Sequence, residues 1–600
     1  MPSRETSLPP SPGDSRDQAA TIARATFDGF LQSDLMPQGM QAPALIWAAA
    51  FLVGPAIFFP IQSMVKYSFI RKFHPELLES TFWNDRMLFL LMSAGAMGIV
   101  SVVLWETLFP ARRDAFVLTP LPVPLPVQML GRLLGLAALC VAFILLLNGI
   151  PAFAFPVVTS EGFLEMPRGI VGHAVSTAAA DVFVFFGITS LQGVVILGLG
   201  RRASTRLATV AQTAAVGTVL LTLLFIGGIR DVTRDAIVRN DPSDPLLLFN
   251  PAAWFLGLYE FIAGPSRPIM GTLALRAVVA AIVPPAITIA IYAFGYQRLL
   301  KRAVETPARS TRSLLTRALS RVVRWTVVRR PEEQAICAFV IRAIARSGRH
   351  SLLMSIYVGA ALAMMITFVL PDIIRHGPSA LAAPAIAALA LPLVLSAGLA
   401  VGIRILITIP AEMPARWVFQ TASISKWRVD GATHKALLLL VLPPVMITAA
   451  LSAGLLWSLQ LGWVHAVYCG SLALLLCEGV LLSFRGVPLA RPYVPGGARV
   501  HMLWALYISF FLTYTLTAAT LERDLYSWSG RQGPLIAAAV FSGCSLGLWA
   551  LRKHRLRSVE AVTFDPDVPE DEIFRGFNLT EIYAAQAVAA HGREARSERH

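Results

Sequence analysis

The sequence has few charged residues for its length. Only 14% of its 600 residues are Asp, Glu, Lys or Arg, whereas 56% are hydrophobic and the mean hydropathy is +0.63. A soluble chain usually keeps about a quarter of its residues charged. This composition excludes a chain built mainly from soluble domains. It predicts an all-α polytopic membrane protein whose first partner is the lipid bilayer.

The sequence also lacks the motifs of common nucleotide-dependent and hydrolytic enzymes. None of its Lys residues follows a Gly, so no phosphate-binding loop ending in Gly-Lys is present. The metalloprotease motif HExxH is missing as well. We therefore expect that this chain binds no cofactor and is not itself an enzyme.

Cysteine is scarce and scattered. The five Cys lie mostly in apolar runs, with no CxxC pair and no Cys/His cluster: Cys140, Cys337, Cys469, Cys477 and Cys544. This pattern indicates neither a disulfide framework nor a metal site, and small buried side chains are the expected role. Residues 1–40 are polar and rich in Pro, so we expect no cleavable signal peptide there.

Apolar runs long enough to cross about 30 Å of hydrocarbon are frequent. They lie near 43–63, 87–109, 133–157, 171–200, 207–228, 273–295, 351–371, 381–409, 435–457, 463–483, 501–521 and 534–551. The sequence thus predicts about twelve transmembrane helices in two six-helix halves, residues 41–297 and 351–551. Residues 1–40 form an N-terminal tail with a weak amphipathic helix, and residues 552–600 form a C-terminal tail.

A basic bridge, residues 298–350, joins the two halves. From Tyr296 to His350 the sequence holds thirteen Arg or Lys against three Glu. Pro331 fits a first helical position, and apolar residues then follow the helical period, which predicts an amphipathic helix lying in the membrane interface. Basic segments also bind nucleic acid, but a loop beside the membrane explains this charge without a ligand. We expect no nucleic acid partner.

Loop charge orients the predicted helices. Placing both termini and the bridge in the cytoplasm, with the chain in the inner (plasma) membrane of the cell, puts most Lys and Arg on the inside. The first external loop opposes this orientation, because it carries Lys66, Arg71, Lys72 and Arg86.

Two inside loops, residues 111–128 and 409–431, share a character. Each follows the second span of its half, begins near a Pro at a membrane edge, and mixes charge with aromatic residues. Restricted backbone at Pro and exposed aromatics favour contact with a partner, although ordinary loops anchored in lipid headgroups would look similar. The candidates for partner contact are Arg112, Arg113, Asp114, Pro120, Pro122, Glu412, Arg416, Trp417 and Phe419.

A few ionisable residues fall within apolar runs, where charge is costly and often functional. The main candidates are His173, Asp181 and Arg404, with Asp181 and Arg404 near the centres of their runs. Glu106, Arg132 and Arg276 lie at or beside run ends, where snorkelling to the interface explains them. His173, Asp181 and Glu106 could also act as acid and base in a membrane enzyme.

One external segment, residues 241–265, has an apolar part too short to span. Pro and Gly bound it, which favours a re-entrant or interfacial helix on the outside. Trp254, Phe255 and Tyr259 are expected at the headgroup level.

Four stretches carry a family resemblance: LFPARRDAFVLTPLPV (108–123), FLGLYEFIAG (255–264), CAFVIRAIARSGRHSLLMSIYVG (337–359) and PAEMPARWVFQ (410–420). Together they resemble large permease-type proteins of bacterial ABC export systems. The resemblance implies elbow helices at 17–34 and 332–347, and a re-entrant element at 246–263. It also implies cytoplasmic coupling loops at 111–126 and 411–430, which would meet a separate ATP-binding subunit.

The leading expectation is therefore the membrane-spanning permease of an ABC-type exporter. Two alternatives remain open. One is an integral membrane enzyme that acts on a lipid-linked substrate, and the other is an ion-coupled secondary transporter that uses Asp181.

Overall fold

The structure is a computed structural model. It describes residues 12–31, 58, 60–105, 107–110, 112–160, 162, 165–198, 201–239, 241, 244–264, 268–304, 327–381, 384–409, 419, 425–482, 484, 487–489 and 500–557. All regular structure in these ranges is helical, which confirms the all-α prediction.

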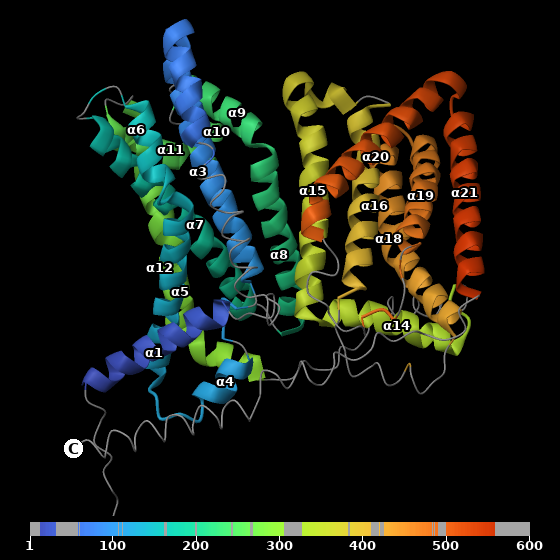
Figure 1. Cartoon of the computed structure of the whole chain (residues 1–600), viewed down its shortest axis with the longest axis horizontal. Helices are drawn as coiled ribbons and strands as arrows, with labels where there is room; N and C mark the ends of the chain where they lie inside the picture. The colour runs from blue at the N-terminus through green and yellow to red at the C-terminus, as the bar shows by residue number, and fades with distance from the viewer. Residues whose placement is uncertain are drawn as a thin grey trace, which may run out of the picture.

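The helices form two groups that stand side by side along the longest axis of the molecule (Figure 1). The first group comprises α1 (Pro12–Leu31), α3 (Leu78–Val103), α4 (Arg112–Leu118), α5 (Leu125–Asn148), α6 (Pro151–Thr159), α7 (Glu165–Gly198), α8 (Arg201–Leu224), α9 (Ile226–Arg239), α10 (Pro245–Leu248), α11 (Pro251–Ala263) and α12 (Pro268–Val304). The second comprises α14 (Pro331–Arg346), α15 (Gly348–His376), α16 (Ile386–Leu406), α18 (Lys426–Leu456), α19 (Leu459–Leu481), α20 (Val500–Ser529) and α21 (Gln532–Arg557).

Within the described residues, nine helices are long and apolar enough to cross a membrane, or ten if one bent pair counts as a span. This fits a multi-pass membrane protein. The predicted count of twelve stays a prediction, because most of the run at 43–63 lies outside the described residues. The run at 501–521 corresponds to α20, whose first side chains also lie outside them.

The predicted span at 207–228 is not one straight helix. Helices α8 and α9 meet at an angle of 75° around residue 225. At this bend, the Phe225 ring lies 2.3 Å from where a Cβ on Gly228 would stand. A Gly is therefore needed for the ring to fold back against the next turn.

Each half buries its own apolar core, and the halves meet where α8 packs against α15. Val216 of α8 and Leu352 of α15 belong to one buried cluster. A Cβ on Gly359 would lie 2.7 Å from a Val216 methyl group and 3.0 Å from the Gly217 amide nitrogen. The two helices approach closely because this position carries no side chain.

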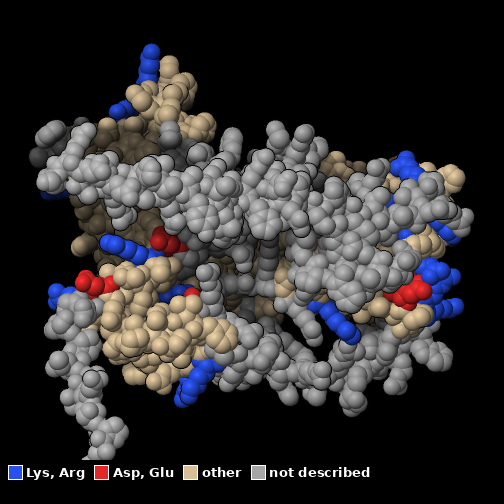
Figure 2. Space-filling model, turned by 60° about the horizontal axis from the view of Figure 1, so that its bottom comes forward, with Lys and Arg blue, Asp and Glu red and all other residues tan. Residues whose placement is uncertain are grey.

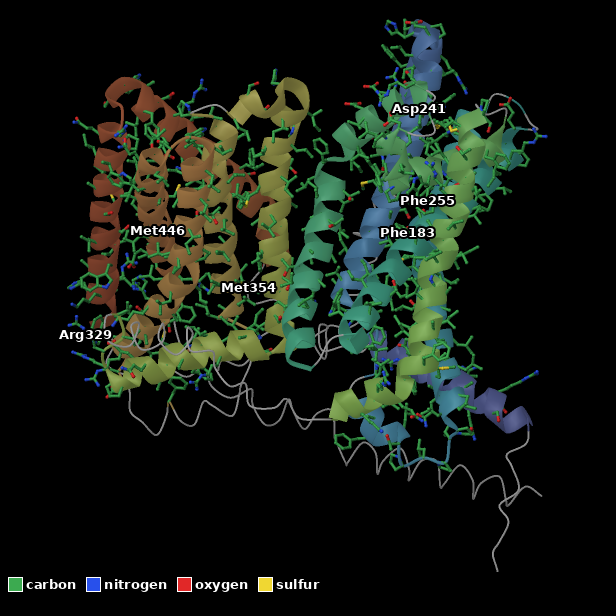
Figure 3. All side chains as sticks on the ribbon, turned by 180° about the vertical axis from the view of Figure 1, so that it is seen from behind. Phe183, Asp241, Phe255, Arg329, Met354 and Met446 are labelled. Atoms are coloured by element: carbon green, nitrogen blue, oxygen red, sulfur yellow. The ribbon has the colours of Figure 1, made fainter. Side chains whose placement is uncertain are left out.

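Three helices lie across one face of the molecule, which we call the α14 face: α1, α4 and α14 (Figure 1). The expected elbow helix at 17–34 corresponds to α1, which packs on α5 so tightly that a Cβ on Gly131 would lie 2.8 Å from the Ala19 carbonyl oxygen. Arg329, just before α14, lies at this face, and Asp241 lies at the opposite one (Figure 3).

Helix α14 matches the predicted amphipathic helix of the bridge. Its buried side chains, Ile336, Val340, Ala343 and Ile344, recur at helical spacing and face the second half. Its acidic first turn is paired, because Glu332 accepts from Arg428 at 2.6 Å and Glu333 accepts from Lys435. Both basic residues belong to α18, so apolar contact and charge fix α14 against the same helix.

Residues 246–263 form the short helices α10 and α11, as predicted, but the aromatic residues do not sit as expected. Phe255 and Tyr259 are buried, and only Trp254 is partly exposed, with its indole nitrogen donating to the Leu247 carbonyl oxygen at 2.9 Å. They point inward because α11 packs between α7 and α12.

Candidate functional site

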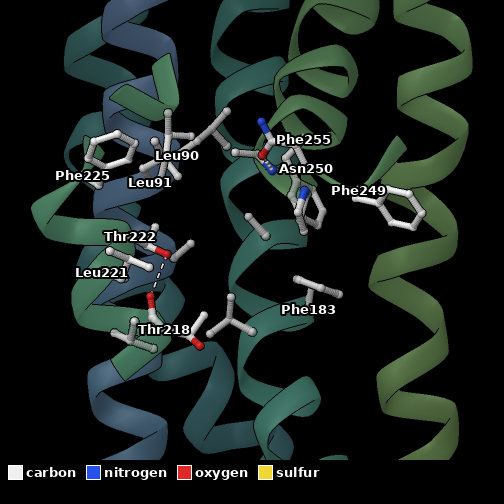
Figure 4. A pocket seen from close by; sticks show the side chains of 18 of the residues that line it. Leu90, Leu91, Phe183, Thr218, Leu221, Thr222, Phe225, Phe249, Asn250 and Phe255 are labelled. Carbon is white, nitrogen blue, oxygen red and sulfur yellow. Dashed lines mark hydrogen bonds between the residues drawn. The ribbon is translucent and has the colours of Figure 1, made fainter. Parts of the chain in front are cut away.

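A cavity in the described part of the chain lies where the two halves meet. Its volume is about 760 Å³, and its walls come from α3, α7, α8, α9 and the start of α11, with Leu370 and Ile374 contributed by α15. Leu90, Leu91, Phe183, Phe225 and Phe255 surround it (Figure 4).

Two of the three polar side chains that line this cavity, Thr222 and Asn250, make hydrogen bonds within the protein. The Thr222 hydroxyl donates to the Thr218 carbonyl oxygen at 2.9 Å, and the Asn250 side-chain amide donates to the Thr233 hydroxyl at 2.7 Å. The Asn250 side-chain oxygen accepts from the Ala252 amide at 3.1 Å. The cavity therefore offers hydrocarbon to a ligand and is suited to an apolar one.

Asp181 of α7 is fully buried, and it does not line this cavity. Its carboxylate accepts from the Ser93 hydroxyl of α3 at 2.8 and 2.9 Å, and from the Asn148 side-chain amide of α5 at 2.7 Å. Among the described residues no cation pairs with it. A buried carboxylate held only by neutral donors is a candidate for proton or cation binding.

His173 lies about two turns further toward the start of α7, surrounded by aromatic rings. The rings of Phe89, Phe155 and Tyr259 lie 5.6, 5.7 and 6.0 Å from its centroid. Its Nε2 has no hydrogen-bond partner in the part of the chain that the structure describes. His173 and Asp181 share no contact and neither lines the cavity. The predicted acid and base are therefore not assembled, and Glu106 lies outside the described residues.

The sequence places Arg404 near the centre of its apolar run, but in the structure it lies in the last turn of α16. Its Nε donates to the Val480 carbonyl oxygen of α19 at 2.8 Å, and its guanidinium lies 5.1 Å from the centroid of Phe484. The run at 381–409 was misleading because α16 already ends at Leu406, before the apolar run does. Arg404 ties the ends of α16 and α19 together.

The segment that contains the first partner-contact candidates, α4 and the residues before it, is held in place by hydrogen bonds from α5 and α12. Arg132 of α5 donates to Asp114 of α4 at 2.9 Å, and its other terminal nitrogen donates to the carbonyl oxygens of Thr107 and Phe109 at 2.7 and 3.1 Å. The Tyr292 hydroxyl of α12 donates to the Leu108 carbonyl oxygen at 2.6 Å. Arg132 is thus a buried anchor rather than a snorkelling residue.

The outer side of the same segment is exposed and apolar. Phe116 and Val117 of α4 are 56% and 55% exposed, and Pro120 and Pro122 are exposed in the loop that leads to α5. Arg112 and Arg113 begin α4, but their side chains lie outside the described part. Figure 2 brings the α14 face forward and shows described Lys and Arg at both ends of it, beside smaller groups of Asp and Glu.

Within residues 410–424, the second loop is described only at Phe419. Glu412, Arg416 and Trp417 lie outside the described residues. Phe419 is buried, and its ring lies 5.8 Å from that of Phe339 in α14. The expectation that Phe419 fills a partner's groove is not met, because α14 already covers it.

Two of the four positive residues that opposed the predicted orientation are neutralised. Lys66 donates to both carboxylate oxygens of Asp85 at 2.9 Å, and Arg86 donates to Glu260 at 2.6 Å. The Tyr67 hydroxyl also donates to Asp85 at 2.6 Å. The positive-inside rule counts Lys and Arg rather than net charge, so these ion pairs leave the opposition from this loop in place.

Two buried clusters of the second half were missed. In the first, Arg552 of α21 bridges Asp430 of α18 at 2.9 Å and Glu478 of α19 at 3.1 Å, and Glu478 also lies 2.8 Å from His434 Nε2. The only signal in the sequence was the spacing of four residues between Asp430 and His434, which places them on one helix face.

The second missed cluster joins His465 and Cys469 of α19 to Glu522 of α20. The expectation that no Cys lies in a cluster with His is wrong. Four residues separate His465 from Cys469, a signal that could have been noticed, but Glu522 is brought in only by the packing of α20.

Comparisons with models of protein families, with curated proteins and with solved structures find no match for this chain.

Proposed function

We propose that this chain is the membrane-spanning permease of an export system, driven by ATP that binds to a separate subunit. The resemblance of its loops to bacterial ABC exporters suggests this role. The observation that carries the proposal is the α4 segment: it is held by buried hydrogen bonds on one side and exposes Phe116 and Val117 on the other. A coupling element must be held in a fixed position on its membrane-facing side and must bind its partner with its other side.

The cavity between the halves supplies a cargo site for such a permease. It is lined by hydrocarbon and includes two residues of α15, so relative movement of the halves changes its walls. A large apolar cargo suits these walls, because charged groups would lose hydration there without gaining partners.

The experiment that tests the proposal is a pull-down of the ATP-binding subunit by membrane-inserted variants at equal expression. Phe116→Ala is expected to weaken recovery strongly, since an aromatic anchor contributes about 2 kcal/mol, or about a 30-fold change in affinity. Phe153→Ala is the matched control, because this ring in α6 is 63% exposed but lies away from the α14 face. Equal recovery with both variants would refute the coupling role of α4.

A second candidate function, ion-coupled transport, has one observation in its favour. Asp181 is buried at 0% exposure between the Ser93 hydroxyl and the Asn148 amide, with no cation beside it in the described part of the chain. If it carries a coupling ion, Asp181→Asn should abolish the dependence of transport on a proton or sodium gradient. Transport that responds to ATP alone in both proteins would exclude this function. The enzyme alternative has less support, since His173 and Asp181 are not brought together.

A further inference from the structure

The cluster of His465, Cys469 and Glu522 lies in the second half, far from the segment proposed for coupling. His465 and Cys469 occupy one face near the start of α19, and Glu522 lies in the last third of α20. All three side chains are buried, with His465 and Glu522 at 0% exposure. Helices α20 and α21 join at the end of the molecule opposite α14 (Figure 1), so the cluster lies toward that end.

The donor atoms already converge. Nδ1 of His465 lies 2.8 and 3.0 Å from the two carboxylate oxygens of Glu522, and Sγ of Cys469 lies 3.6 Å from the same nitrogen. One donor atom from each residue falls within 4.8 Å of the others. Tetrahedral Zn²⁺ has bonds of about 2.0–2.3 Å, which places its ligands about 3.3–3.8 Å apart. The distance between Sγ and Nδ1 already falls in this range, whereas the 2.8 and 3.0 Å between Nδ1 and the carboxylate oxygens must open slightly.

The composition of the cluster also favours a cation of this kind. Nitrogen, sulfur and carboxylate oxygen together suit a borderline-soft divalent ion such as Zn²⁺, whereas Mg²⁺ and Ca²⁺ prefer oxygen alone. One Zn²⁺ with one thiolate and one carboxylate is electrically neutral, which lowers the cost of burying the charges in an apolar interior. Without a metal ion, the hydrogen-bonded pair of His465 and Glu522 leaves the Cys469 thiol with only a weak contact.

A further polar group at this place lacks a partner. Tyr526 follows Glu522 by one helical turn, and its hydroxyl is buried without a hydrogen-bond partner among the described residues. Three protein ligands leave a fourth position on a tetrahedral ion. A water bound there could accept a hydrogen bond from the Tyr526 hydroxyl.

We propose that His465, Cys469 and Glu522 bind one divalent transition-metal ion of the zinc class, which ties α19 to α20. Binding displaces the thiol proton of Cys469 and the proton shared by His465 and Glu522, and both protons leave to solvent. No redox step is involved. The inference does not depend on the proposed export function.

The test uses the full chain, purified in detergent, stripped with a chelator and titrated with Co²⁺. Wild type should bind about one equivalent and show a thiolate-to-cobalt absorption band in the near ultraviolet, which Zn²⁺ then abolishes. Cys469→Ser should lose the band. Cys477→Ser is the matched control, because Cys477 is a buried Cys two turns further along α19, and it should keep the band.

A variant that retains Cys469 as its only Cys protects the test against a folding failure of Cys469→Ser, and it also removes the exposed Cys544. This variant should keep the band and should melt at a higher temperature with Zn²⁺ than without it. Absence of the band from both wild type and this variant would overturn the proposal and leave only a hydrogen-bonded pair. A band that persists in Cys469→Ser would overturn it as well, since the ion would then be bound elsewhere.

Discussion

At the scale of single residues, Arg132 decides where the proposed coupling segment sits. Its guanidinium makes three hydrogen bonds, to Asp114 and to two backbone carbonyl oxygens before α4. Arg132 was predicted only as a residue that snorkels from a run end. The sequence could not reveal the anchor, because its partners lie 18 to 25 positions away and only the turn between α3 and α4 brings them near.

Replacement of Arg132 should loosen α4. Arg132→Ala leaves Asp114 and two carbonyl oxygens without their donor, so we expect a loss of about 1.5–3 kcal/mol in the free energy of unfolding. Arg428→Ala removes an ion pair whose two side chains are 41% and 43% exposed, and should cost at most about 1 kcal/mol. Thermal unfolding in nanodiscs measures both. Equal effects would contradict the anchoring role of Arg132.

Asp244 gives a prediction for pH outside the membrane-spanning helices. The hydrogen bonds from Arg239, and then the one from the Leu246 amide, hold the pKa of Asp244 below its usual value. Folding is therefore favoured above the ordinary Asp pKa of about 3.9, and this contribution is lost as the pH falls through the lower folded pKa. The melting temperatures of wild type and Asp244→Asn should differ at pH 6 and converge toward pH 3. A difference that stays constant would contradict this assignment.

At the scale of elements, apolar periodicity identified most helices but not how they bend or what they contact. The runs at 171–200, 273–295 and 463–483 correspond to α7, α12 and α19. The bend between α8 and α9 was missed because hydropathy stays high through Phe225, and only the ring's contact with Gly228 explains it. Phe255 was placed in the headgroups because its burial depends on α7 and α12, which its own segment does not specify.

The contact of α8 with α15 should be sensitive to side-chain volume. Gly359→Leu would push a Cβ within 3.0 Å of the Gly217 amide nitrogen, so we expect a loss of about 1–3 kcal/mol from overpacking. Gly543→Leu is the control, since nothing lies within 4 Å of its Cβ position in α21. Thermal unfolding should separate the two variants clearly. If Gly359→Leu is as stable as the control, the halves do not pack in this way.

At the scale of the whole molecule, the sequence predicted two helical groups joined by a basic bridge, and the structure shows two groups with α14 across one face. The basic part of the bridge, residues 305–326, lies outside the described residues, as do Trp417 and most of the second loop. The candidate sites were less predictable than the fold. The cavity, the Arg552 network and the cluster at Glu522 each combine residues from helices that are distant in sequence.

The orientation of the molecule gives a prediction of its own. If the α14 face is cytoplasmic, an impermeant thiol reagent added to intact cells should not label Ser310→Cys or Ala590→Cys, in a background without native Cys. It should label Trp528→Cys, which replaces an 81% exposed residue beside the turn between α20 and α21. Labelling of position 310 or 590 together with protection of 528 would reverse the orientation.

We propose that α4 meets an ATP-binding subunit, and a photo-crosslinking amino acid at position 116 would report this contact. In native membranes under ultraviolet light, we expect a crosslink from position 116 to a protein that binds ATP. The same amino acid at position 153, also exposed but away from the α14 face, should give no such product. Crosslinks only to lipid at position 116, or the same ATP-binding product from both positions, would contradict the proposed contact between α4 and an ATP-binding subunit.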